Sequence, residues 1–206
     1  MRTTVPFRWW FLFSFAAGLA LLASFYFDAS AQAWIAQHQS VEIKDFMRRV
    51  SRLGDWPPHI VLGFIFLTLA YWRRNQRWMR IVAAMILAFA LAGTTSRVIK
   101  ISTGRARPDV QTEAGWIGSR FSSRYNAFPS GHTATSTAFF ATLAFASWRI
   151  GLAFLALPLL IAFSRMYVGA HHLSDVVGAV LLGTVIAYVV VRWIPIIRNT
   201  PPEIRD

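Results

Sequence analysis

The chain alternates long apolar runs with short segments that carry most of its charge. A membrane-crossing helix needs about 20 mainly apolar residues. Six runs approach or reach that length: Trp9–Phe27, His59–Trp72, Ile81–Val98, Gly131–Trp148, Leu152–Val168 and Val176–Ile197. The pattern predicts an all-α protein with six transmembrane helices in a single domain over residues 1–206. The run His59–Trp72 is short, and the alternative for it is a re-entrant or interfacial segment.

The first run allows two interpretations. Arg2 and Arg8 precede it and Ala29-Ser30-Ala31 follows it, which is also the layout of a cleavable signal peptide. Its apolar part exceeds the roughly 7–15 residues of such peptides, so we expect an anchor that stays attached.

The segment Ser40–Leu53, between the first two runs, has a different periodicity. Its apolar residues recur at helical spacing and its charged residues fill the other face. Gly54 is a plausible stop, and Pro57 and Pro58 forbid continuation. We expect a short amphipathic helix in the headgroup region. A role in gating substrate access is the alternative.

Composition and charge agree with a membrane protein. The chain is 55% hydrophobic with a mean hydropathy of +0.44, against about 45–50% apolar residues in soluble domains. Its formal net charge is +12, but the basic residues lie largely in short loops. This distribution favours anionic lipids over nucleic acid as the partner. The absence of cysteine excludes disulfides, thiolate metal sites and a cysteine nucleophile.

The loop charges also predict an orientation. One face holds the N-terminus and a set of arginines in the loops or at the chain's end: Arg73, Arg74, Arg77, Arg80, Arg149, Arg192, Arg198 and Arg205. By the positive-inside rule this face is cytoplasmic. Residues 28–58, 99–130 and 169–175 then lie on the periplasmic side of a bacterial inner membrane.

Charged groups cluster at the periplasmic ends of the predicted spans, where a common partner would offset their cost beside lipid. Lys100 closes the third span, and Arg107 follows seven residues later, held extended by Pro108. Two cations at a helix exit can reach one anion from different directions. A simple snorkelling anchor is the alternative for this pair alone.

The sequence Pro129-Ser130-Gly131-His132 opens the fourth span. Ser130 suits the N-cap position, and Gly131 allows an anion to approach the backbone. A helix N-terminus offers free N–H groups and a positive dipole end, which together bind phosphate. His132 then lies in the first turn, beside whatever binds. An ordinary capped helix is the alternative.

A third motif links the fifth and sixth spans. Arg165 lies beyond Pro158, which we expect to kink the fifth span, and His171 and Asp175 lead into the sixth. At four residues apart, His171 and Asp175 are expected to share a helix face and to form a hydrogen bond. Such a bond fixes the imidazole tautomer and leaves the other nitrogen as a nucleophile or base. His172, three residues before Asp175, is also within reach.

The combined pattern K-x6-RP, PSGH and SR-x5-H-x3-D resembles the signature of the type 2 phosphatidic acid phosphatase family, lipid phosphate phosphatases related to the vanadium haloperoxidases. The resemblance covers Lys100 to Asp175 and the six-span layout, while residues 1–98 carry no family motif. It implies that Lys100, Arg107 and Arg165 hold the phosphate, with Ser130 and the Gly131 N–H as further donors.

The resemblance also assigns the chemistry. It implies that His171 is the nucleophile and forms a phosphohistidine, that Asp175 orients it, and that His132 is the general acid. No metal or other cofactor is implied, and one carboxylate within the motifs is too few for a usual divalent-cation site.

The expected function is metal-independent dephosphorylation of a membrane lipid at the periplasmic face. The substrates that the resemblance implies are undecaprenyl diphosphate, phosphatidylglycerol phosphate, phosphatidate and lipid A phosphate. One alternative is a phosphotransferase that moves phosphate from a lipid diphosphate to another lipid. The other is a protein that binds or transports an anionic lipid and needs no nucleophile. The sequence leaves the choice of lipid and the oligomeric state open.

Overall fold

The computed structural model describes residues 7–110 and 115–194. Within these ranges it is all-helical, without strands, so the expected all-α class is confirmed. Its helices are α1 (Phe7–Tyr26), α2 (Asp28–His38), α3 (Val41–Arg52), α4 (Trp56–Trp72), α5 (Gln76–Thr103), α6 (Gly131–Ala146), α7 (Trp148–Phe154), α8 (Ala156–Tyr167) and α9 (Leu173–Trp193), with a 3-10 turn at Ser123–Tyr125.

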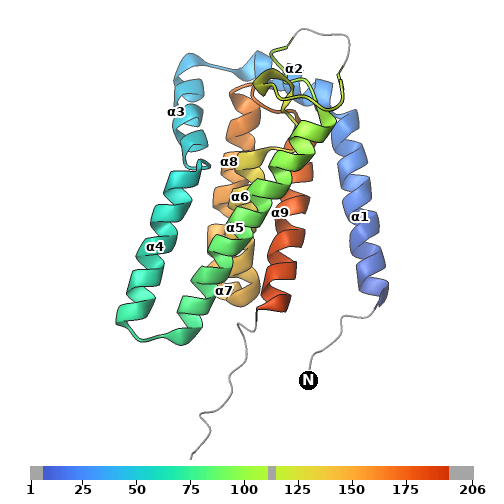
Figure 1. Cartoon of the computed structure of the whole chain (residues 1–206). Coiled ribbons are helices and arrows are strands. Elements are labelled where there is room, and N and C mark those ends of the chain that lie inside the picture. The colour runs from blue at the N-terminus through green and yellow to red at the C-terminus, as the bar shows by residue number, and fades with distance from the viewer. Residues whose placement is uncertain (1–6, 111–114, 195–206) are drawn as a thin grey trace, which may run out of the picture.

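Helix α6 is the centre of the bundle and packs most extensively on α9 and α5 (Figure 1). Its residues from Thr133 to Leu143 are all buried, and Phe139 joins Ile81 and Met85 of α5 in the core. Close approach depends on small residues, because a Cβ at Gly183 of α9 would lie 2.6 Å from the carbonyl oxygen of Ala134. Small residues at helix contacts are typical of membrane bundles.

Three helical stretches are long and apolar enough to cross a membrane: Gln76–Thr103, Trp148–Tyr167 and Leu173–Trp193. Two bent pairs, α1 with α2 at 56° and α3 with α4 at 51°, raise the number to five if each counts as one span. Helix α6 has 16 residues, fewer than a typical span. The described residues thus support three to five crossings, and the sixth stays a prediction, as does the end of the last span beyond residue 194.

Of two sequence-based expectations about helices, one changes and the other holds for the helix itself. The fifth span is broken at Leu155, between α7 and α8, and Pro158 lies in the first turn of α8, where a missing N–H costs nothing. The amphipathic helix is confirmed as α3, with the Ser40 hydroxyl accepting a hydrogen bond from the Ile43 N–H at 3.2 Å. It stands beside α8, above α4 (Figure 1). Its location in the headgroup region stays a prediction.

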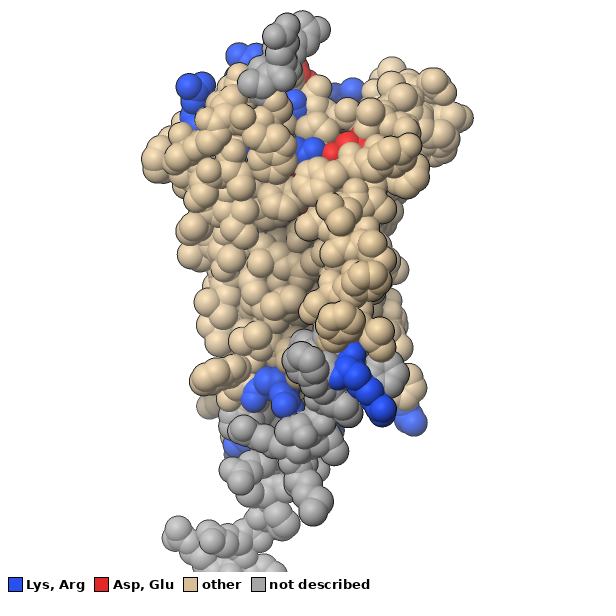
Figure 2. Space-filling model, turned by 90° about the vertical axis from the view of Figure 1, so that its right-hand side faces the viewer, with Lys and Arg blue, Asp and Glu red and all other residues tan. Residues whose placement is uncertain are grey.

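The two ends of the bundle are polar and its middle is not. In the view of Figure 2, a broad band without lysine, arginine, aspartate or glutamate separates charged groups at the two ends. At one end lie the α4–α5 turn, α7 and the C-terminal end of α9. At the other end, the C-terminal ends of α5 and α8 meet the N-terminal ends of α6 and α9 (Figure 1).

Candidate active site

The residues of the three sequence motifs come together at this second end. Lys100 lies in the last turn of α5, Arg165 in the last turn of α8, and His132 in the first turn of α6. Asp175 lies in the first turn of α9, and His171 in the connection that precedes it. The ends of α5, α6, α8 and α9 thus meet at one place. This is how motif residues up to 75 positions apart in the sequence form one site.

His171 and Asp175 form the buried centre of the site. The Nδ1 of His171 lies 3.4 Å from Oδ2 of Asp175, and the exposed fractions of these side chains are 2% and 0%. They do not share a helix face as expected, because α9 begins only at Leu173. The pairing instead spans the helix start, where the same Oδ2 accepts a hydrogen bond from the His172 backbone N–H at 2.8 Å.

The surroundings of His171 favour its uncharged form. Burial, together with the positive charges of Lys100 and Arg165, lowers the pKa of His171 to about 3, against the opposing effect of Asp175. The imidazole is therefore neutral near pH 7, and with Nδ1 facing Asp175 its Nε2 is left as the reactive nitrogen. His172 also places Nδ1 within 3.2 Å of Asp175, but its side chain is more exposed, at 17%.

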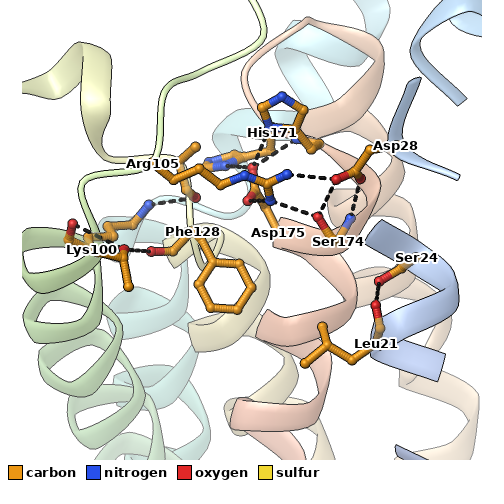
Figure 3. A network of polar contacts seen from close by, with 12 residues as sticks. Leu21, Ser24, Asp28, Lys100, Arg105, Phe128, His171, Ser174 and Asp175 are labelled. Atoms are coloured by element: carbon orange, nitrogen blue, oxygen red, sulfur yellow. Dashed lines mark hydrogen bonds and ion pairs between the residues drawn. The ribbon is translucent and has the colours of Figure 1, made fainter. Parts of the chain in front are cut away.

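A second carboxylate and an arginine support Asp175 from behind (Figure 3). Arg105 donates to Oδ1 of Asp175, to the Ser174 hydroxyl at 2.7 Å and to Oδ2 of Asp28 at 2.6 Å. Asp28 in turn accepts from the backbone N–H and the hydroxyl of Ser174, at 2.8 and 2.6 Å. All four residues are buried, so each charge has a partner, as burial of charge requires.

Aromatic rings enclose the Arg105 guanidinium. Its central carbon lies 5.1 Å from the ring centre of Phe25 and 5.0 Å from that of Trp116, which are cation–π distances. Phe128 packs on both rings. Trp116 and Phe128, both in the loop between α5 and α6, thus belong to this cluster, whereas Phe121 of the same loop is 85% exposed, as aromatic residues at a membrane interface are. Residues 111–114 of that loop lie outside the described residues.

Three cations surround the space in front of His171. Lys100, Arg107 and Arg165 are close enough for their charges to repel one another. Lys100 Nζ donates to the carbonyl oxygens of Asn126 and Ala127, at 2.6 and 3.3 Å. The Nε atoms of Arg107 and Arg165 are buried and have no hydrogen-bond partner among the described residues. Mutual repulsion and unsatisfied buried donors both favour an anion between these groups.

The start of α6 forms the floor of this space. Ser130 is the N-cap residue and is fully buried, but its side chain makes no capping hydrogen bond. Its hydroxyl accepts from the Thr133 hydroxyl at 3.0 Å, which leaves its own hydrogen free to donate. The Lys100 side chain lies over Gly131, with its Cε 3.6 Å from where a Cβ of that glycine would be. Phosphate binding at this helix N-terminus stays a prediction, and the free Ser130 hydrogen and the nearby Lys100 side chain are consistent with it.

The corner between α3 and α4 closes the site from the other side. Nε2 of His132 lies 2.6 Å from Oδ1 of Asp55, and NH1 of Arg165 donates to the Ser51 hydroxyl at 2.5 Å. Gly54 allows this approach, because a Cβ there would lie 2.9 Å from the Cβ of His132. Gly54 therefore matters for space, in addition to its expected role of ending the helix.

The structure brings together all eight residues that the sequence motifs predict for the site: Lys100, Arg107, Ser130, Gly131, His132, Arg165, His171 and Asp175. Sequence reasoning missed Asp28, Arg105 and Asp55, which contact them. The only local signal for Arg105 was a second arginine two residues before Arg107. For the two aspartates no local pattern existed, since each contact spans more than 70 residues.

No metal-binding arrangement stands out in the described part of the chain. It contains no group of three or more histidine, aspartate or glutamate side chains placed to hold a metal ion.

The comparisons with known proteins identify the family of this bundle. Residues 81–198, more than half of the chain, match the family model of the PAP2 superfamily. The chain therefore belongs to the PAP2 superfamily, which confirms the resemblance seen in the motifs.

Curated relatives include a lipid A 1-phosphatase of Rhizobium etli, 27% identical over 86% of this chain and 82% of the relative. A lipid A 1-phosphatase of Rhizobium johnstonii is 36% identical over 49% of this chain, an alignment that spans 43% of the relative. The undecaprenyl-diphosphatase BcrC of Bacillus subtilis is 32% identical over 34% of this chain and 37% of its own length. Family and relatives together support the predicted class, a lipid phosphatase.

Two solved structures share the fold. A transmembrane PAP2-type phosphatidylglycerolphosphate phosphatase from Bacillus subtilis matches with a TM-score of 0.65 and 21% identity, over 87% of this chain and 91% of that one. Aquifex aeolicus LpxE matches with a TM-score of 0.57 and 20% identity, over 81% and 95%. The bundle is thus a membrane-protein fold that extends beyond the residues matched by the family model.

Proposed function

We propose that this protein removes phosphate from a membrane lipid phosphate or diphosphate through a phosphohistidine, without a metal ion, at the periplasmic face of the inner membrane. The observation that carries the proposal is the buried His171–Asp175 pair beside Lys100 and Arg165, with Arg107 close to both of these cations. A transport or binding protein would need the cations but not a neutral, carboxylate-oriented imidazole.

The first chemical step is displacement at phosphorus. Nε2 of His171 attacks, the bond from phosphorus to the lipid oxygen breaks, and His132 gives its proton to that oxygen. Lys100, Arg107 and Arg165 offset the charge on the three remaining phosphate oxygens, with Ser130 and the Gly131 N–H as further donors. Asp175 holds the imidazole and stabilises the positive charge that it gains.

The second step returns the enzyme to its starting state. Water attacks the phosphohistidine, and the neutral His132 takes a proton from that water. The bond from phosphorus to Nε2 breaks, releasing inorganic phosphate and the neutral His171. Atoms and charge balance over the cycle without a co-reactant other than water.

The substrate class follows from the relatives and the location of the site. A lipid A 1-phosphatase relative aligns over most of the chain, so the 1-phosphate of lipid A is our first candidate among the four lipids. The site lies at the end of the apolar band (Figure 2), where the phosphate of a lipid headgroup would be. A lipid can then present its phosphate while its chains stay in the bilayer.

The test is phosphate release by the purified protein in detergent, with EDTA present, from lipid A, undecaprenyl diphosphate, phosphatidylglycerol phosphate and phosphatidate. We expect wild-type turnover with one lipid preferred. His171→Ala should lose at least about 10³-fold in kcat, since a covalent route disappears. His38→Ala is the matched control, because His38 is exposed and its side chain contacts Trp34 of its own helix.

Two outcomes would contradict the proposal. Full activity of His171→Ala would rule out His171 as the nucleophile. Loss of wild-type activity in EDTA would rule out a metal-free mechanism. Radiolabelled phosphate that appears on a second lipid, rather than free in solution, would identify the enzyme as the lipid-to-lipid phosphotransferase.

A further inference from the structure

The general acid of the proposed reaction has a carboxylate partner of its own, Asp55. Its Oδ1 lies 2.6 Å from Nε2 of His132, a short hydrogen bond between a ring N–H and a carboxylate. Asp55 lies in the α3–α4 corner, outside residues 81–198 that match the family model. Neither the sequence motifs nor the comparisons assign it a role.

The local sequence frees Asp55 for this contact. Asp55 is the N-cap residue of α4, a position where aspartate ordinarily accepts a hydrogen bond from the N–H two or three residues on. Those two residues here are Pro57 and Pro58, which have no N–H. The Asp55 carboxylate accordingly makes no capping bond and turns to His132 instead.

The backbone of the corner is fixed where the contact requires it. The Asp55 N–H donates to the Arg52 carbonyl at 3.1 Å, and the Asp55 carbonyl lies 3.0 Å from Nδ1 of the buried His59. Gly54 lets the corner lie against the first turn of α6, since a Cβ would lie 2.9 Å from the Cβ of His132 and 2.8 Å from Ile161. These contacts place the half-exposed Asp55 carboxylate at the His132 imidazole.

The charges around His132 explain why such a partner is needed. Burial has the largest effect and, with the nearby charges of Arg165 and Lys100, it disfavours a protonated His132, whereas Asp55 is the neighbouring group that favours it. A general acid has to carry its proton when the bond to the lipid oxygen breaks. The same cations that bind phosphate would otherwise drive that proton away.

We propose that Asp55 is a positioning residue that favours the protonated form of His132 and directs its free Nδ1–H toward the leaving oxygen of the lipid. The inference rests on the proposed function and adds a second histidine–carboxylate pair to it. His171–Asp175 attacks phosphorus, and His132–Asp55 protonates the group that departs. The proton that leaves Nδ1 goes to the lipid oxygen, and hydrolysis of the phosphohistidine returns it from water.

The test compares two leaving groups. A short-chain phosphatidate releases an alkoxide, which needs a proton, whereas p-nitrophenyl phosphate releases a stabilised phenolate, which does not. For Asp55→Asn we expect kcat/KM with phosphatidate to fall roughly 10–100-fold, within the 10²–10⁴ that general acid catalysis supplies. With p-nitrophenyl phosphate we expect a change of less than about threefold, since the acid contributes little there.

Matched variants separate this role from a structural one. Asp45→Asn removes an exposed carboxylate of α3 and should change neither rate. Gly54→Ala displaces the corner and should reproduce the phosphatidate-selective loss, while Gly18→Ala, in open space, should not. In a double variant with His132→Ala, Asp55→Asn should cost nothing further with phosphatidate, because it acts through that histidine.

The inference is overturned if Asp55→Asn lowers kcat/KM equally for both substrates, or lowers it for neither. An equal loss would indicate a role in folding or phosphate binding, and no loss would indicate an incidental contact. Failure of the wild-type enzyme to release phosphate would instead refute the proposed function, so the two failures are distinguishable.

Discussion

Asp175 illustrates at the scale of one residue how the site is stabilised. Oδ2 faces His171 and accepts from the His172 N–H, while Oδ1 accepts from Arg105. A fully buried carboxylate would be costly without such partners. Arg105 is in turn neutralised by Asp28, so the plane of the Asp175 carboxylate is set by residues that never touch the phosphate.

Asp28→Asn tests this support. The substitution leaves Arg105 with one carboxylate instead of two, and the orientation of Asp175 becomes less defined. We expect kcat to fall roughly 10–100-fold, by analogy with the loss of outer-shell partners of metal-ligating histidines, with KM nearly unchanged. Breaking a buried ion pair should also cost about 3–5 kcal/mol in stability.

The control for Asp28→Asn is Asp45→Asn. Asp45 pairs with Arg48 at the surface, with exposed fractions of 53% and 57%. An exposed pair contributes about 0–1 kcal/mol, so neither kcat nor the melting temperature should move noticeably. A loss confined to KM in Asp28→Asn would contradict the positioning role and indicate substrate binding instead.

At the scale of elements, α6 depends on small residues of its neighbours. A Cβ at Gly183 would lie 2.6 Å from the Ala134 carbonyl oxygen and 2.8 Å from Cβ of Thr137. Gly183→Ala should therefore push α9 from α6 and destabilise the fold by about 1–3 kcal/mol, the usual cost of overpacking. The melting temperature in detergent, followed by circular dichroism, measures this.

Gly18→Ala is the comparison for Gly183→Ala. It lies within α1 with nothing near its Cβ position, so alanine should be neutral or slightly stabilising. An unchanged melting temperature in both variants would show that the α6–α9 contact relaxes at no cost.

The elements also show what a sequence can and cannot predict. Apolar runs located α1, α4, α5, α6 and α9 to within a few residues, because burial in a bilayer or a bundle acts on every residue of a run. Local motifs predicted the site because each occupies a helix end. The break at Leu155 was missed, since no residue there signals it, and Pro158 is harmless in a first turn.

Long-range partners were unpredictable for a different reason. Asp28 and Asp55 make their contacts across 146 and 77 residues, and neither lies in a periodic pattern. Asp28 directly precedes Ala29-Ser30-Ala31, so cleavage there would remove it from the site. Its contacts support the interpretation of the first run as an uncleaved anchor, which stays a prediction.

At the scale of the whole molecule, the bundle has two chemically different ends. Arg73, Arg74, Arg77 and Arg80 gather around the α4–α5 turn, opposite the site (Figure 1). Arg198 and Arg205 lie outside the described residues. The positive-inside rule predicts that the arginine-rich end faces the cytoplasm and that the site faces the periplasm.

Cysteine labelling tests this orientation, since the chain has no cysteine of its own. Ser119→Cys places one thiol in an exposed loop at the site end, and Gln76→Cys places one at the exposed start of α5. A membrane-impermeant maleimide should label Ser119→Cys in intact cells with a permeabilised outer membrane, but Gln76→Cys only after lysis. The reverse pattern would place the site in the cytoplasm.

The positions of Asp28 and Asp55 in the sequence have a practical consequence for protein engineering. Both precede residue 81, where the family-defining segment starts. A chimera that joined only residues 81–198 to the N-terminal helices of another protein would keep all three motifs. It would lose the carboxylates of Asp28 and Asp55. Exchange of the first 80 residues between relatives should therefore change the catalytic rate as well as the choice of lipid.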